Sequence, residues 1–319
     1  LSSADKNTGL GFEVFDDLTS GDNNTALGHQ ALTKLTTGSS NTAIGIGALD
    51  ANTTANNNVA VGASSLTANT TGTANVAVGV NSLNANTTAD NNTALGFLAL
   101  TANTTGTNNT AVGTNAGAAV TTGVENTLIG ALAGDALTDA DENTAVGKSA
   151  LTTDTLGSRS TAIGQGTLAT QNFTTATQTY NTAVGFQAGN AVTTGVQNTL
   201  IGSLAGDAFT DADKNTAVGT NALSSDTLGS KSVAVGTAAL FTQNFTTATD
   251  TYNTAIGSNA GESVTTGIQN TLVGGLAGDA ITSGNSNVAI GYDSLSADTL
   301  GDRNVAVGLQ ALKSQNFTT

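Results

Sequence analysis

The apolar and polar positions of this chain repeat with a period of 17 residues. Each repeat opens on Asn-Thr-Ala-Val-Gly or a close variant, and we number its positions from the asparagine. The motif occurs 18 times at steps of 17, with two steps of 21, and begins at Asn7, Asn24, Asn41, Asn58, Asn75, Asn92, Asn109, Asn126, Asn143, Ser160, Asn181, Asn198, Asn215, Ser232, Asn253, Asn270, Asn287 and Asn304. Such regularity predicts a stack of identical structural units.

The length of the repeat selects the kind of stack. Helical-hairpin repeats have roughly 33 to 47 residues and leucine-rich repeats roughly 20 to 29, so 17 residues are too few for either. Seventeen residues suit one coil of a β-solenoid, with short strands that pair in parallel with the next coil at about 4.8 Å. The sequence therefore predicts an all-β fold, a parallel β-solenoid of 17-residue coils.

The first five positions of the coil support this prediction. Position 5 is always glycine, which indicates a positive φ or a backbone approach too close for a Cβ atom. Position 1 is asparagine in 16 of the 18 coils, so its amides are expected to form a ladder. We take four coils as markers of this structural ladder, through Asn41 and Gly45, Asn109 and Gly113, Asn181 and Gly185, and Asn253 and Gly257.

The strand has two compact faces, and the pattern leaves open which one lies inside. Positions 2 and 4 carry Thr or Val and an aliphatic residue, whereas positions 1, 3 and 5 carry Asn, Ala and Gly. We expect each coil to bury about three apolar side chains, at positions 3 or 8, 4 and 9. This is little for 17 ordered residues, so we also expect several chains to associate side by side.

The chain divides by the form of its repeats. Residues 1–6 are a leading segment, and residues 7–108 form regular 17-residue coils. Residues 109–319 follow a 72-residue super-repeat in which every fourth coil gains four residues, and we expect one continuous solenoid throughout. Leucine replaces alanine at position 3 in one coil of each super-repeat, at Leu128, Leu200 and Leu272.

Composition removes several classes of function. The 319 residues include no Cys and have a net charge of −15, which argues against disulfides, thiolate metal sites and a nucleic-acid surface. No apolar run is long enough to span a membrane, so we expect no membrane insertion of this segment. Because the chain begins with Leu1, we interpret it as a processed product or as part of a longer protein.

Few residues suggest chemistry. Two similar acidic turns place Asp139 and Asp141, and then Asp211 and Asp213, at a 72-residue step. Their carboxylates are weak candidates for Ca²⁺ ligands, although Asp residues also commonly cap turns. The single histidine, His29, cannot form a histidine metal site, and no nucleophile recurs beside it. We therefore expect no catalytic residue and no bound cofactor, and the protein is predicted not to be an enzyme.

The four-residue insertions concentrate the aromatic residues. The segments 171–180 and 243–252 are nearly identical, and they hold Phe173, Tyr180, Phe245 and Tyr252. Insertions in a solenoid bulge outward and often form the binding face. These four residues are candidate receptor contacts, with the alternative that the rings only brace the bulge.

Several motifs resemble a known family. Asn58-Val-Ala-Val-Gly62, Asn75-Val-Ala-Val-Gly79 and Asn287-Val-Ala-Ile-Gly291 are similar to the head repeat of trimeric autotransporter adhesins, and the small residue that follows there is matched by Ser65, Ser82 and Ser294. The longer form from Asn92 to Gly106 resembles repeats of phage and viral tail fibres. The resemblance covers residues 7–319. It implies a left-handed β-roll, a homotrimer and attachment to a host surface.

Together these features predict an extracellular structural or adhesive fibre shaft, from a virion tail fibre or a cell-surface adhesin. Its expected partners are two further copies of itself and a host receptor, which is a glycan or a protein. Two alternatives remain open. An ice-binding solenoid would need rows of Thr-x-Thr, which the aliphatic position 4 interrupts. A glycan-degrading tail spike would need a pair of acids in a groove.

Overall fold

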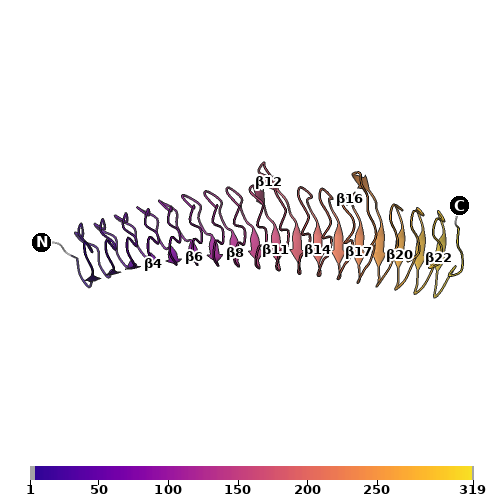
Figure 1. Cartoon of the computed structure of the whole chain (residues 1–319), viewed down its shortest axis with the longest axis horizontal. Coiled ribbons are helices and arrows are strands. Elements are labelled where there is room, and N and C mark those ends of the chain that lie inside the picture. The colour runs from indigo at the N-terminus through magenta and orange to yellow at the C-terminus, as the bar shows by residue number, and fades with distance from the viewer. Residues whose placement is uncertain (1–3, 318–319) are drawn as a thin grey trace. The chain divides into compact units, whose positions relative to one another are not determined.

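The protein is an all-β parallel solenoid of about 18 coils, as the computed structural model of residues 4–317 shows (Figure 1). Over these residues the chain forms strands and turns without a helix. Accordingly, the described residues contain no helix of the length and apolarity that a membrane span requires. The fold class predicted from the 17-residue period is confirmed.

The chain folds as two compact units. Unit 1 comprises Leu1–Ser158 and Thr174–Thr177, and unit 2 comprises Arg159–Phe173 and Gln178–Thr319. In each unit the coils follow one another in chain order, and each coil contributes one three-residue strand at positions 2 to 4 (Figure 1).

The strands of unit 1 pair in parallel, each with the strand of the next coil. They are β1 (Thr8–Leu10), β2 (Thr25–Leu27), β3 (Thr42–Ile44), β4 (Val59–Val61), β5 (Val76–Val78), β6 (Thr93–Leu95), β7 (Thr110–Val112), β8 (Thr127–Ile129) and β9 (Thr144–Val146), followed by the short β10 (Gly157–Ser158). The register joins equal positions, so that Ala60 lies opposite Ala77. The hydrogen-bonding period is thus the sequence period.

Unit 2 has the same arrangement, with one additional short pair at an insertion. Its strands are β11 (Thr161–Ile163), β13 (Thr182–Val184), β14 (Thr199–Ile201), β15 (Thr216–Val218), β16 (Gly229–Ser230), β17 (Val233–Val235), β18 (Thr249–Asp250), β19 (Thr254–Ile256), β20 (Thr271–Val273), β21 (Val288–Ile290) and β22 (Val305–Val307). Strand β12 (Thr177–Gln178) lies where the two units divide. The insertion with β16 and β18 extends beyond the coils next to it (Figure 1).

Glycine at position 5 is required by contact between successive coils. Gly45 has φ of +138°, and a Cβ atom there would lie 2.4 Å from the carbonyl oxygen of Gly62. Both the backbone conformation and the spacing therefore exclude other residues.

The interior of the coil is narrow and partly polar. In the coil that begins at Asn58, the buried residues are Asn58, Ala60, Ser65, Leu66, Asn69 and Gly72, which occupy positions 1, 3, 8, 9, 12 and 15. The expectation that position 4 is buried within its own coil is wrong. Its aliphatic side chains point outward and are exposed or half-buried, because position 4 lies on the strand face opposite to that of the buried position 3.

Leucine at position 3 packs into the space that glycine leaves at position 9. A Cβ atom on Gly189 would lie 2.7 Å from Cδ1 of Leu200, and one on Gly206 would lie 2.8 Å from Cδ2 of the same leucine. Leu200 thus fills the space that position 9 leaves empty in two successive coils. Leu128 and Leu272 meet glycines in the same way, which explains their 72-residue spacing.

Candidate functional site

The ladder residues join successive coils from inside. In unit 1 the backbone N–H of Asn41 donates to Oδ1 of Asn24 at 2.9 Å, and its Nδ2 donates to the carbonyl of Ala55 at 2.8 Å. Asn109 makes the equivalent bonds with Asn92 and Gly123. Each amide therefore closes its own coil and also accepts from the next one, and these side chains are buried away from any ligand.

The acidic turns use their carboxylates to bind the backbone of the preceding coil. Oδ1 of Asp141 accepts from the N–H of Val124 at 2.8 Å, and Oδ1 of Asp213 accepts from the N–H of Val196 at the same distance. Asp139 and Asp211 accept from threonine hydroxyls of the preceding coil. Over residues 4–317 no group of three or more His, Cys, Asp or Glu is arranged to hold a metal ion.

The aromatic residues of the insertions divide into two pairs. Phe173 and Phe245, predicted as receptor contacts, are buried, with 6% and 7% of their surface exposed. Tyr180 and Tyr252 are about half exposed, at 48% and 52%. The phenylalanines therefore brace the insertions from within, and only the tyrosines can meet a partner. The polar end of Tyr lies toward solvent while the wholly apolar ring of Phe is covered, as hydration favours.

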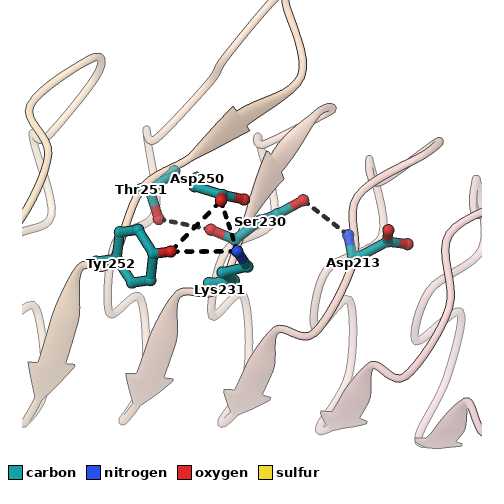
Figure 2. A network of polar contacts seen from close by, with 6 residues as sticks. All are labelled: Asp213, Ser230, Lys231, Asp250, Thr251 and Tyr252. Carbon is teal, nitrogen blue, oxygen red and sulfur yellow. Dashed lines mark hydrogen bonds and ion pairs between the residues drawn. The ribbon is translucent and has the colours of Figure 1, made fainter.

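Tyr252 belongs to an exposed cluster with a cation and an anion (Figure 2). Nζ of Lys231 lies 5.2 Å from the centre of the ring, 3.2 Å from the tyrosine oxygen and 2.5 Å from Oδ2 of Asp250. The hydrogen bond from Lys231 lowers the pKa of Asp250, and a smaller contribution comes from the charge of Lys214. The cluster fixes the ring in one orientation at the surface.

Tyr180 occupies the equivalent place in the first insertion. Nη1 of Arg159 donates to its oxygen at 3.0 Å, and the guanidinium lies 5.8 Å from the ring centre. The tyrosine hydroxyl in turn donates to Oε1 of Gln178 at 2.6 Å. Both insertions thus present a tyrosine held by the basic residue of the coil before it.

Behind Tyr252, a buried polar network closes the enlarged coil. Nε2 of Gln243 donates to Oδ2 of Asp226 at 2.5 Å and to Oγ of Ser232 at 3.0 Å, while its Oε1 accepts from Nδ2 of Asn253 at 2.8 Å. Asp226 also accepts from the backbone N–H groups of Gly229 and Phe245. Burial raises the pKa of Asp226 in spite of these bonds.

The first insertion repeats this network around Gln171, Ser160 and Asn181. In both insertions the glutamine side-chain oxygen accepts the hydrogen bond from the asparagine of the next coil, because the serine at position 1 is too short to do so. The signal was present in the sequence, because Ser160 and Ser232 are the two exceptions to asparagine and each begins a coil with four additional residues. The connection between the serines and the insertions becomes evident only in the structure, where Gln171 and Gln243 reach the serine hydroxyls.

His29 is exposed and stacks on Phe12, with ring centres 5.3 Å apart. This contact joins two coils at position 6. It gives the imidazole an aromatic packing partner.

No family model matches the chain, and no curated protein matches it. A functional proposal for this chain therefore rests on the motifs at positions 1 to 5 and on the surfaces described above.

Proposed function

We propose that this protein is a segment of an extracellular fibre, a phage tail-fibre shaft or a trimeric surface adhesin that presents host-receptor contacts along left-handed coils. The observation that carries the proposal is the outer face of the sheet. Positions 2 and 4 place Thr, Val, Ile and Leu there in every coil, and no charged residue among them.

This outer face is unusually apolar for a surface that remains in water. The exposed fractions of Leu95, Ile201 and Ile256 are 46%, 39% and 41%. A continuous apolar surface rimmed by polar residues is typical of an interface between proteins. Because the chain has a net charge of −15, an uncharged strip is also where two copies repel each other least.

We infer that the occupant is a second and a third copy of the same chain. Every coil repeats the same face, so identical chains in parallel place like coils against like coils along the stack. Pairing of this face would add the apolar core that the narrow coil interior lacks. Three copies would also present each insertion three times and raise avidity through effective concentration.

The test of assembly uses a triple variant of the outer face: Ile44→Asp, Leu95→Asp and Ile201→Asp. We expect light scattering to give three times the chain mass for the unaltered protein at micromolar concentration and a smaller mass for the variant. Circular dichroism of the variant should be unchanged because these side chains contribute little to the coil interior. An unaltered protein that stays monomeric contradicts the assembly.

Thr37→Asp, Thr71→Asp and Thr105→Asp together form the matched control, since they add the same charges at exposed position 14. This control should retain the mass of the unaltered protein. Attachment is tested separately, by saturable binding of the labelled assembly to a panel of bacterial and animal cells. Absence of saturable binding to all of them counts against the adhesive role.

Two further assays separate the proposal from its alternatives. Thermal hysteresis of the purified protein would favour an ice-binding solenoid. Release of oligosaccharides from a glycan would favour a tail spike.

A further inference from the structure

One corner of the coil collects most of the basic residues of this acidic chain. Four of the eight Lys and Arg occupy position 17, where an even spread over the coil would place fewer than one, and they are Arg159, Lys214, Lys231 and Arg303. A fifth, Lys6, has the equivalent place directly before the first coil. The two insertion tyrosines, Tyr180 and Tyr252, have the equivalent place in their 21-residue coils, as the last residue before the next position 1. Cations and exposed rings are therefore on one edge of the solenoid.

Within unit 2 the backbone holds these residues in one row along the stack. The last residue before the next position 1 has a positive φ throughout, for example +58° at Lys214, +63° at Lys231 and +52° at Tyr252. The N–H of Lys214 donates to the carbonyl of Val196, and the N–H of Lys231 donates to that of Asp213, each at 3.0 Å. The side chains consequently leave the same corner at the inter-coil spacing of about 4.8 Å.

From this row we infer a binding site in unit 2 for a linear acidic glycan, with its uronate carboxylates on Lys214 and Arg303 and its sugar rings on Tyr180 and Tyr252. The inference rests on the proposed adhesive function and names the class of receptor. A glycan chain of this kind lies along the stack, and its sugar units advance by a distance comparable to the coil spacing.

The chemistry of the row fits sugars with carboxylates. Tyrosine offers an apolar ring face with a polar edge, and both tyrosines are held in place by neighbouring polar groups. Guanidinium and ammonium groups form charge-assisted hydrogen bonds with carboxylates. Lys231 is already bound to Asp250 and serves to position Tyr252, whereas Lys214 and Arg303 are exposed.

Acidic side chains beside the row limit the charge that it can attract. Asp213, Asp250 and Asp302 lie at or near this corner, where Asp213 is bound to the backbone of Val196 and Asp250 to Lys231. The row therefore offers few free cations, whereas binding of a nucleic acid rests on many Lys and Arg contacts to phosphates. The two rings are also four coils apart, about 19 Å, which is too far for stacking on successive bases.

The experiment measures binding of the purified full chain to polygalacturonate, alginate and hyaluronan by isothermal titration calorimetry, with dextran as the neutral probe and single-stranded DNA as the competing polyanion. We expect binding to at least one polyuronate, none to dextran and weaker binding to DNA. The double substitution Lys214→Gln and Arg303→Gln should weaken polyuronate binding at least about tenfold. Each lost contact to a charged group reduces the affinity by roughly a factor of ten. Tyr252→Ala should have a similar effect.

Lys148→Gln is the matched control, because it removes one exposed cation from position 6 and should leave the affinity within about twofold. Circular dichroism confirms that each variant is folded. Failure to bind all three polyuronates, equal binding to DNA, or equal losses in Lys148→Gln overturns the inference. A change of oligomeric mass in Lys214→Gln/Arg303→Gln without a change of affinity would reassign the row to contacts between copies.

The outcomes separate this inference from the proposed function. A trimer that binds cells but no polyuronate would refute only the glycan row. A monomer that binds polyuronate through Lys214 and Arg303 would refute only the fibre assembly.

Discussion

The regular coils of unit 1 and the super-repeat coils of unit 2 follow the same backbone path but have different side chains in their interiors. In residues 41–108, position 12 is always asparagine, and the amides form a second buried ladder, in which Nδ2 of Asn86 donates to Oδ1 of Asn69 at 2.9 Å. In unit 2 the same position holds Val192, Phe209, Asp226 and Gln243 in turn. Oδ1 of Asn103 is buried without a partner, because Val120 follows it and ends the ladder.

The two kinds of interior differ in how far they specify the order in which the coils stack. Identical ladders form equally good hydrogen bonds if a whole coil is skipped. They therefore stabilise stacking without specifying which coil lies next to which. Coil-specific contacts, such as Leu200 beside Gly189 or Gln243 beside Asp226, are lost when a coil is displaced by one, two or three positions, because they recur only with the 72-residue super-repeat. The super-repeat therefore adds specificity to a stack that the ladders alone leave degenerate.

The strongest way to break either region is at position 5, which they share. Gly62→Ala places a Cβ atom 2.5 Å from the carbonyl oxygen of Gly79, and neither backbone can move without opening the stack. We expect a loss of at least about 4 kcal/mol in the free energy of unfolding, measured by denaturant titration and hydrogen exchange. Gly47→Ala, whose nearest neighbour is 3.7 Å away, should cost only about 1 kcal/mol for its positive φ. Equal losses would contradict the close-approach argument.

The apolar packing of unit 2 is tested by exchanging its two coil types. Leu200→Ala should cost about 3 kcal/mol, because it leaves a cavity beside two glycines. Gly189→Leu alone should also destabilise, through collision with Leu200. The double variant restores the regular pattern of small position 3 and large position 9, so its loss should be well below the sum. Additive losses in a double-mutant cycle would show that the two positions are independent.

The polar ladder of unit 1 lacks the glutamine that accompanies serine in unit 2. Asn75→Ser removes the acceptor of the Asn92 N–H and the donor to the carbonyl of Ala89, both in a buried site. We expect a loss of about 2 kcal/mol and faster hydrogen exchange at Asn92. The exposed substitution Thr71→Ser should change stability by less than about 0.5 kcal/mol. A neutral Asn75→Ser would mean that Gln243 is not needed to compensate for Ser232.

The smallest expected effect is on pH dependence, and it is confined to unit 2. Because burial raises the pKa of Asp226, the folded state binds its proton more tightly than the unfolded state, and stability gained from this group rises as pH falls from 7 through the folded pKa. Replacing the carboxyl group in Asp226→Asn should abolish that rise. Denaturant titrations at several pH values measure it.

Asp250, in the same insertion, gives stability the opposite dependence on pH. Its pKa is lowered chiefly by the hydrogen bond from Lys231, so its contribution is present above the ordinary pKa of Asp and is lost as pH falls through the folded value. Asp250→Asn should therefore remove a decline of stability in acid. If both variants change the pH profile in the same direction, the assignment of the two carboxyls is wrong.

Much of the candidate surface could be placed from the sequence and some of it could not. The insertions and their tyrosines were recognisable from the 72-residue period. The burial of Phe173 and Phe245 was not, because Phe and Tyr differ only in an oxygen whose access to water depends on the fold. The row of basic residues and tyrosines was also missed, since its members in unit 2 are 17 to 51 residues apart in sequence and are brought to one edge only when the coils stack.

The sequence by itself determined the coil length, the parallel register and the need for glycine at position 5, because each of these repeats with the period and has one local physical cause. Only the tertiary structure decided which strand face is inside. Alternation makes the two faces equivalent along a single strand, and the choice depends on the space left by positions 8, 9 and 12 on the opposite side of the coil. That space exists only after the chain has closed on itself.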